Sequence, residues 1–220
     1  AYASEEEAKT ASKKPETVSA DQPAAQTAEP VKVACVGDSI TFGAGIKERE
    51  TQCYPVQLGQ LLGDEFEVRN FGVNGATLLK QGDLPYWNRP QFKMATEFQP
   101  DIVIIKLGTN DSKPQNWKFA SQYGSDLIAM ISHFQNLDSQ PEIYVCRPVP
   151  VPTNRWGITE EVVKGEVIPA INKAVKRTKG VKIVDLYKAL APHPELLPDG
   201  VHPNAEGAKL MAQTIYNQIK

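Results

Sequence analysis

The feature that most constrains the fold is an alternation, from residue 31 onward, of short β-branched runs with segments of helical periodicity. We expect strands in the runs VKVACV (31–36), FEVRNF (66–71), DIVIIKL (101–107), EIYVCR (142–147) and VKIVDL (181–186). Most of these runs are too continuously apolar to have one face in water. This pattern is typical of strands that are buried on both faces of a sheet.

Helices are expected between and after these strands, where apolar residues recur at helical spacing. The expected segments are YPVQLGQLL (54–62), QFKMATEF (91–98), a longer helix with Tyr123, Leu127, Met130, Ile131, Phe134 and Leu137 on one stripe, and residues 159–178 and 204–219. Parallel neighbouring strands need crossover connections, which cover both faces of the sheet. The sequence therefore predicts the α/β class, as a three-layer α/β/α sandwich around a five-stranded parallel sheet.

Residues 1–30 differ from the rest of the chain. They contain eight alanines, three prolines and an acidic run at 5–7, with only Tyr2 and Val18 as larger apolar groups. Such a segment cannot bury enough surface to offset the entropy of ordering. We expect residues 1–30 to form a flexible tail or linker, which can carry an additional module, and residues 31–220 to form one domain. The opening Ala-Tyr-Ala is compatible with a small-residue cleavage site, so the expected location is secreted or periplasmic, and otherwise cytoplasmic.

Charge and hydropathy exclude two classes of partner. The formal net charge of −2 provides no basic field for binding nucleic acid. No window approaches the roughly 20 apolar residues that a membrane span requires. Cys35 and Cys146 lie inside strand-like runs and Cys53 stands apart, which favours three free thiols over a disulfide framework.

Polar residues follow the strands at the edge of the sheet where ligands bind in such folds. The loops in question are Gly37-Asp38-Ser39, Gly72-Val73-Asn74-Gly75, Gly108-Thr109-Asn110-Asp111 and Asp199-Gly200-Val201-His202-Pro203-Asn204. Each has an ordinary structural explanation if taken alone, because Asp and Ser cap helices, and Gly and Asn occupy turns. Together, however, the loops contain everything that acyl transfer needs.

The acyl-transfer reaction needs an activated nucleophile, a base, a group that orients the base, and donors for an oxyanion. Ser39 is the candidate nucleophile and His202 the candidate base, and Asp199 is close enough in sequence to orient the His202 ring. The backbone N–H groups of Ser39 and Gly72 and the side-chain amide of Asn110 are the candidate oxyanion donors. We expect Asn204 to cap the last helix. His133, on an amphipathic helix, and His193, in a proline-rich turn, are interpreted as structural.

These four blocks resemble those of the SGNH (GDSL) hydrolase family, in the family's order along the chain. The resemblance rests on GDSIT with Ser39, Gly72 in NFGVNGAT, Asn110 in GTND, and DGVHPN with Asp199 and His202. It implies a flavodoxin-like fold, no metal or organic cofactor, and two-step ester hydrolysis through an acyl-serine. It assigns Ser39, His202 and Asp199 the catalytic roles, and Ser39, Gly72 and Asn110 the oxyanion hole.

The segments GATLLKQGDLPYWNRP and GTNDSKPQNW look more like the sialate O-acetylesterase-type and carbohydrate acetylesterase members of the family. We therefore expect removal of short acyl groups, acetyl first, from an acetylated sugar or polysaccharide. Lysophospholipase, thioesterase or arylesterase activity is the alternative within the family. Tyr86, Trp87 and Arg89 follow the second strand, and Lys113, Asn116 and Trp117 follow the third. We expect substrate contacts from Asp38, Tyr86, Trp87, Lys113 and Trp117, although exposed aromatic residues also serve to pack loops.

Two other classes of function are weighed against the esterase. A metallophosphoesterase could use Asp38, Asp111, Asp199 and His202, but dinuclear sites of that kind generally need several histidines. A non-catalytic glycan-binding domain on the same scaffold is the second alternative. It has no need of the acid that orients a base, and the complete set of polar residues therefore favours the enzyme.

Overall fold

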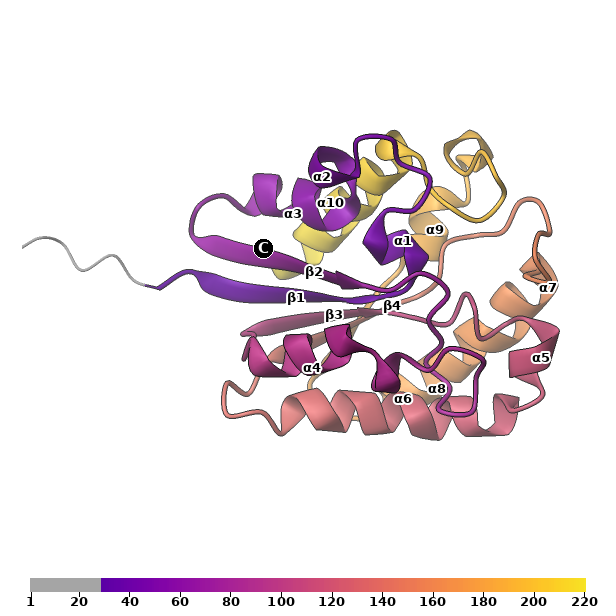
Figure 1. Ribbon diagram of the computed structural model, residues 1–220, viewed down its shortest axis with the longest axis horizontal. Helices are drawn as coiled ribbons and strands as arrows, with labels where there is room; N and C mark the ends of the chain where they lie inside the picture. The colour runs from indigo at the N-terminus through magenta and orange to yellow at the C-terminus, as the bar shows by residue number, and fades with distance from the viewer. Residues whose placement is uncertain (1–28) are drawn as a thin grey trace, which may run out of the picture.

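The computed structural model describes residues 29–220, so nearly all of the predicted tail lies outside the described residues. Its five strands form one parallel sheet in the order β2-β1-β3-β4-β5, which is the flavodoxin-like order. The strands are β1 (Val31–Gly37), β2 (Phe66–Gly72), β3 (Ile102–Lys106), β4 (Glu142–Cys146) and β5 (Val181–Val184). The predicted three-layer α/β/α sandwich is confirmed (Figure 1).

The central strands are buried because their alternate side chains enter two different cores. In β1, Val33 and Cys35 belong to one core, whereas Ala34 and Val36 belong to the other. Ile104 and Ile105 of β3 divide in the same way. This explains why the runs are continuously apolar rather than alternating with polar residues.

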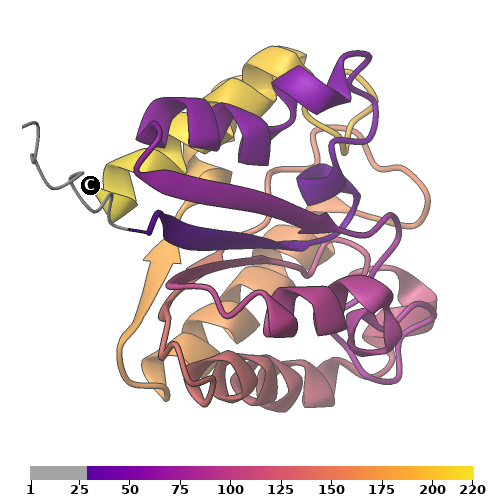
Figure 2. The same ribbon diagram turned by 60° about the vertical axis from the view of Figure 1, so that its left-hand side comes forward.

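Helices cover both faces of the sheet. The layer drawn above the sheet in Figure 1 contains α2 (Arg49–Gln52), α3 (Tyr54–Leu62), α9 (Leu186–Leu190) and α10 (Ala205–Ile219). The layer below it contains α4 (Pro90–Glu97), α6 (Ala120–Gln135) and α8 (Ile168–Lys176). Figure 2 shows the same two layers after rotation.

Short elements lie close to the ends of the strands. They are α1 (Ser39–Phe42), the 3₁₀ turn η1 (Tyr86–Asn88), α5 (Pro114–Trp117), α7 (Glu160–Val162), the π-helical segment η2 (Val163–Val167) and the 3₁₀ turn η3 (Pro194–Leu196). In Figure 1, α1, α5 and α7 lie on the right, toward which the strands point. The carboxyl ends of the strands therefore carry the irregular loops in which a site was predicted.

The last predicted strand and the predicted helix 159–178 differ from the structure for identifiable reasons. The last strand ends at Val184 because the side chain of Asp185 accepts a hydrogen bond from Lys188 N (3.0 Å) and caps α9. The predicted helix 159–178 is not uniform, since the π-helical segment separates α7 from α8. Pro169 has no N–H to donate to the carbonyl of Gly165, and the wider turn lies directly before it.

Three further observations concern the thiols, the helices and the titratable groups of the described residues. Cys35, Cys53 and Cys146 are buried free thiols, as expected. None of the helices in residues 29–220 combines the length and apolarity that crossing a bilayer requires. Over the same residues, no three His, Cys, Asp or Glu side chains gather in a group that could hold a metal ion.

Candidate active site

Ser39, His202 and Asp199 form one hydrogen-bonded line. Ser39 Oγ lies 2.9 Å from His202 Nε2, and His202 Nδ1 lies 2.8 Å from Asp199 Oδ2. Ser39 is the first residue of α1, directly after β1, whereas Asp199 and His202 lie in the loop before α10. The side chain of Asn204 caps α10, as predicted, by accepting from Gly207 N at 2.9 Å. This arrangement can pass a proton from the serine to the imidazole while the carboxylate holds the ring.

The carboxylate of Asp199 holds both the ring and the backbone of its loop. Oδ1 accepts from the N–H groups of Val201 (2.9 Å) and His202 (2.7 Å), while Oδ2 faces the ring. Partial burial alone would raise the pKa of Asp199, but the hydrogen bonds from His202 and Val201 outweigh it and lower the pKa below its usual value. Asp199 is therefore an anion at neutral pH, and an anion favours the tautomer with its proton on Nδ1.

A buried ion pair lies beneath the serine. Asp38 and Lys106 are both completely buried, and Lys106 Nζ lies 3.2 and 3.1 Å from the two carboxylate oxygens of Asp38. Asp38 also caps α1 by accepting from Ile40 N (2.9 Å), and Lys106 donates to Thr109 Oγ1 (2.8 Å). The expectation that Asp38 contacts substrate is wrong, because its side chain does not reach the surface. Its structural interpretation as a helix cap is the correct one.

The predicted oxyanion hole needs one correction. The N–H of Gly72 donates to Asn70 Oδ1 (2.9 Å), and a Cβ at Gly72 would lie 2.1 Å from the backbone nitrogen of Phe42. Gly72 is thus a glycine because α1 packs directly on β2, and its N–H is not free. Gly75, three residues later, lines the same cavity as Ser39 and Asn110. Among residues 29–220, no acceptor lies within hydrogen-bond range of the N–H groups of Ser39 or Gly75.

The loops after β2 and β3 are tied together, which fixes Gly75 next to Asn110. One N–H of the Asn110 side chain donates to Ala76 O (3.1 Å), and this leaves the second N–H for a ligand. The buried carboxylate of Asp111 accepts from Leu78 N (3.1 Å) and Leu79 N (2.7 Å). The side chain of Asn116, which is also buried, donates to Asn110 O (2.9 Å). Asn116 therefore stabilises the loop that carries Asn110.

A cavity of about 350 Å³ opens over the serine. Among its walls are the polar or flexible groups expected at a reaction centre, and one exposed aromatic ring: Ser39, Gly75, Asn110, Lys113, Trp156 and His202. Asn74, Ala44, Ile158 and Val201 complete the lining. Trp156 and Ile158 belong to a loop after β4 that carries no catalytic motif, so neither residue stands out in the sequence.

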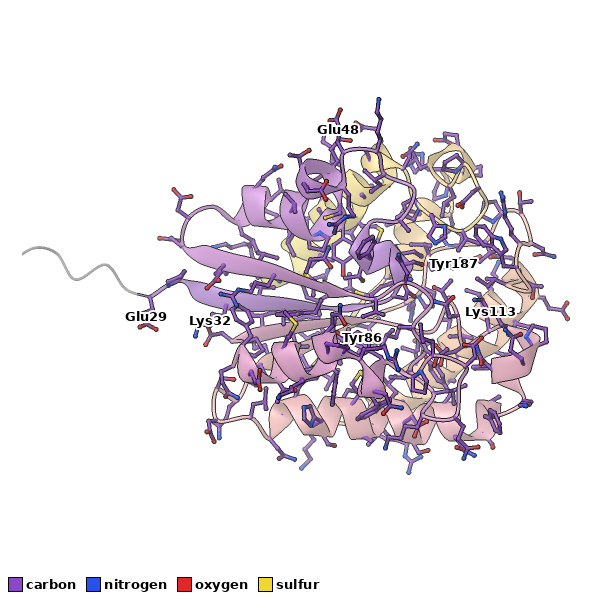
Figure 3. All side chains as sticks on the ribbon, in the orientation of Figure 1. Glu29, Lys32, Glu48, Tyr86, Lys113 and Tyr187 are labelled. Atoms are coloured by element: carbon purple, nitrogen blue, oxygen red, sulfur yellow. The ribbon has the colours of Figure 1, made fainter. Side chains whose placement is uncertain are left out.

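Of the predicted substrate contacts, only Lys113 lines this cavity. Tyr86 is fully buried and its hydroxyl donates to Phe71 O (2.7 Å), so it is a core residue. Trp87 Nε1 donates to Leu78 O, and Trp117 Nε1 donates to Glu166. Both tryptophan rings pack against the core below the sheet. Figure 3 shows Lys113 at the end to which the strands point and Tyr86 in the layer below the sheet.

The other two histidines lie outside the cavity. His133 Nε2 lies 2.8 Å from Thr96 Oγ1, its ring packs on Phe92, and burial lowers its pKa. His193 is exposed and lies next to Glu195. His202 is the one histidine of the described residues that faces Ser39.

A serine, an imidazole and a carboxylate in hydrogen-bonded order, at the carboxyl ends of a parallel sheet and beside free N–H donors, define the class of serine-dependent acyl hydrolases. The chain belongs to the GDSL-like Lipase/Acylhydrolase family, which it matches over residues 35–210. It is 41% identical to an acetylxylan esterase from Xylanibacter ruminicola, over 86% of this chain and 43% of that protein. The chain therefore spans less than half the length of this relative.

Solved structures share the fold at low sequence identity. A carbohydrate acetylesterase family member from Sinorhizobium meliloti superposes with a TM-score of 0.69 at 20% identity, over 86% of this chain and 97% of that one. A putative arylesterase from Agrobacterium tumefaciens gives the same TM-score and identity, over 86% and 98% of the two chains. These likenesses support the sandwich architecture.

Proposed function

We propose that this chain is a serine esterase that removes acetyl groups from carbohydrate O-acetyl esters through an acyl-serine intermediate. The observation that carries the proposal is the line from Ser39 through His202 to Asp199, which opens into a cavity beside the unpaired N–H groups of Ser39 and Gly75. Each group that two-step ester hydrolysis requires is thereby present.

In the first step His202 Nε2 takes the proton of Ser39 as Oγ attacks the ester carbonyl. The tetrahedral intermediate carries a negative oxygen, which the N–H groups of Ser39 and Gly75 and the free amide hydrogen of Asn110 stabilise. When the intermediate collapses, the C–O bond to the alcohol breaks. The protonated His202 gives its proton to the leaving oxygen, and the acetyl group remains on Ser39.

In the second step a water molecule replaces the departed alcohol. His202 takes one proton from the water as its oxygen attacks the acetyl carbonyl, and the same N–H groups stabilise the second oxyanion. Collapse of this intermediate breaks the bond to Oγ and releases acetic acid, and His202 returns the proton to Ser39. The anionic Asp199 stabilises the imidazolium in both steps.

The preference for an acetylated carbohydrate rests on the relative with 41% identity, which is an acetylxylan esterase. A site of about 350 Å³ with small residues such as Ala44 and Gly75 in its walls suits a short acyl group. Arylesters, thioesters and lysophospholipids are the alternative substrates that the family resemblance implies. They would place a different alcohol or a longer acyl chain in the same cavity.

The test is acetate release from acetylated xylan, an acetylated cellobiose, O-acetyl sialic acid and p-nitrophenyl acetate, each measured with the wild-type protein and with Ser39→Ala. We expect serine-dependent release from at least one of the sugar esters. Release from p-nitrophenyl acetate alone would keep the esterase mechanism and overturn the carbohydrate assignment. Equal rates for the wild-type protein and Ser39→Ala would overturn the mechanism itself.

A further inference from the structure

Trp156 is an exposed aromatic residue in the wall of the cavity. Trp156 belongs to the loop after β4, and 53% of the residue remains accessible to solvent. The indole ring lies 5.5 Å from the imidazole of His202, centroid to centroid, at an interplanar angle of 55°. An exposed tryptophan so close to His202 contributes little buried area to the stability of the fold.

The backbone at Trp156 is unusual for such a large residue. Arg155 and Ile158 exchange two backbone hydrogen bonds, of 3.0 and 2.8 Å, around a two-residue turn. The two central residues, Trp156 and Gly157, have φ angles of +53° and +79°. Positive φ at both central positions is the mark of a type I′ turn, in which Asn-Gly is strongly preferred. A tryptophan here is a backbone outlier that leaves 53% of the residue exposed, and such outliers gather at functional sites.

The turn is firmly attached to the rest of the molecule. The N–H of Val151 donates to Glu160 Oε2 (2.7 Å), and the hydroxyl of Tyr187 hydrogen-bonds the other oxygen of Glu160. Val151 and Ile158 are buried in a small cluster with Val201, the residue next to His202. The position of the indole relative to His202 is therefore fixed by packing at the base of the loop.

Arg155 supports the ring from the side of the turn. Its guanidinium carbon lies 4.5 Å from the centroid of the indole, and its Nη1 donates weakly to Asp199 O (3.4 Å). A guanidinium over an indole is a favourable cation–π arrangement. Arg155 thus limits the rotation of the ring and connects it to the loop of the catalytic groups.

The mechanism determines which part of a substrate lies near Trp156. His202 must protonate the oxygen of the leaving alcohol, so that oxygen has to lie next to Nε2. The acyl carbonyl oxygen, in contrast, faces Ser39, Gly75 and Asn110. The group attached to the leaving oxygen therefore lies beside His202, and Trp156 is the ring that borders this side of the cavity.

We propose that Trp156 is a binding residue for the alcohol part of the substrate, and that its indole packs against the C–H face of the pyranose ring that carries the acetyl group. The inference rests on the proposed function and adds to it the place where the sugar binds. Aromatic side chains supply a large, rigid contact area for such a face. Because the acetyl-Ser39 intermediate no longer holds the alcohol, Trp156 acts in acylation and not in deacylation.

The turn itself supplies the decisive variant, Trp156→Asn. It removes the ring and creates the Asn-Gly pair that a type I′ turn prefers, so the loop keeps its conformation and thermal stability is unchanged or raised. Trp156→Phe keeps an aromatic ring. Met94→Ala is the matched control, since Met94 is equally exposed (54%) but lies on α4, away from the cavity.

Initial rates are measured on acetylated xylan and on ethyl acetate, whose leaving alcohol has no ring. We expect Trp156→Asn to lower kcat/KM for acetylated xylan about 10-fold, or ~1.4 kcal/mol of transition-state stabilisation. The rate on ethyl acetate should change less than about twofold, since no ring is available for Trp156 to bind. Trp156→Phe should recover most of the loss, and Met94→Ala should match the wild-type protein on both esters.

The outcomes separate this inference from the proposed function. A wild-type protein that cleaves ethyl acetate but no sugar ester overturns the carbohydrate assignment, and the sugar-binding role of Trp156 with it. Cleavage of acetylated xylan by Trp156→Asn at the wild-type rate overturns only the role of Trp156. Equal losses on both esters would instead make Trp156 a residue that positions His202, which also overturns sugar binding.

Discussion

The Oγ atom of Ser39 lies 2.9 Å from Nε2 of His202, although 163 positions separate the two residues in the chain. Ser39 follows the end of β1, and His202 precedes α10, which packs on the same face of the sheet as α3. The contact thus depends on the correct assembly of the layer above the sheet. Catalytic activity therefore requires that α10 packs correctly on the sheet.

Asp199→Asn is expected to abolish most of the activity without unfolding the loop. The amide oxygen of the new side chain can still accept from Val201 N and His202 N, which leaves the NH₂ group facing Nδ1. The ring must then carry its proton on Nε2, where it can no longer take the proton of Ser39. We expect kcat to fall about 10³- to 10⁴-fold at an unchanged melting temperature.

The control for this substitution is Asp64→Asn, which makes the same change of charge at an exposed turn. It should leave kcat at the wild-type value. An Asp199→Asn protein that keeps more than about a tenth of its activity would show that the tautomer of His202 does not limit the reaction.

Asn110→Ala tests the oxyanion hole. The side-chain amide of Asn110 has one hydrogen bonded to Ala76 O and one directed to the cavity. Loss of one oxyanion donor typically lowers kcat by about 10²- to 10³-fold. Because the donor acts mainly in the transition state, kcat and kcat/KM should fall together while KM stays constant. A rise in KM with kcat unchanged would assign Asn110 to substrate binding instead.

The ion pair beneath Ser39 predicts a non-additive effect on stability. In Lys106→Met the carboxylate of Asp38 stays buried without its cation, and we expect the free energy of unfolding to drop by about 3–5 kcal/mol. Asp38→Asn in the same chain removes the stranded charge and keeps an oxygen to accept from Ile40 N. The double variant should therefore be more stable than Lys106→Met alone. Urea unfolding measures both, and strictly additive losses would contradict the prediction.

The sequence was sufficient to predict the sandwich because apolar runs and helical stripes alternate regularly. It was also sufficient to bring Ser39, Asn110, Asp199 and His202 to one edge, since the strands of a parallel sheet all end there. It could not distinguish Gly72 from Gly75 as the oxyanion donor. Gly72 is the last residue of β2 and Gly75 lies three residues later, and only the structure shows that the N–H of Gly72 already has an acceptor, Asn70 Oδ1.

Residue type alone also failed to show which aromatic residues face the cavity. Tyr86 and Trp87 lie in a loop after a strand, but their polar atoms donate to the backbone carbonyls of Phe71 and Leu78, and the rings fill the core. Trp156 carries no motif. Its place beside His202 results from a tight turn and the small cluster below it, and both depend on contacts between distant parts of the chain.

Asp111 predicts a pH dependence of stability that is separate from catalysis. Burial raises the pKa of Asp111 to about 7, despite hydrogen bonds from Leu79 N and Leu78 N that oppose the rise. An unfolded aspartate has a pKa of about 3.9, so between these two values the folded state holds a proton that the unfolded state has lost. Folding stability from Asp111 is then fully present below about pH 4 and is lost as the pH rises toward 7.

Comparison with Asp111→Asn isolates this effect, because the other titrating groups are common to both proteins. The free energy of unfolding of the wild-type protein, minus that of the variant, should fall steadily from about pH 4 to 7 and level off near pH 8. Each unit of difference between the folded and unfolded pKa is worth about 1.4 kcal/mol. Urea unfolding at half-unit pH steps gives the curve. A difference that stays constant or rises with pH would mean that the buried carboxylate is ionised throughout, with its charge balanced by the N–H groups of Leu78 and Leu79.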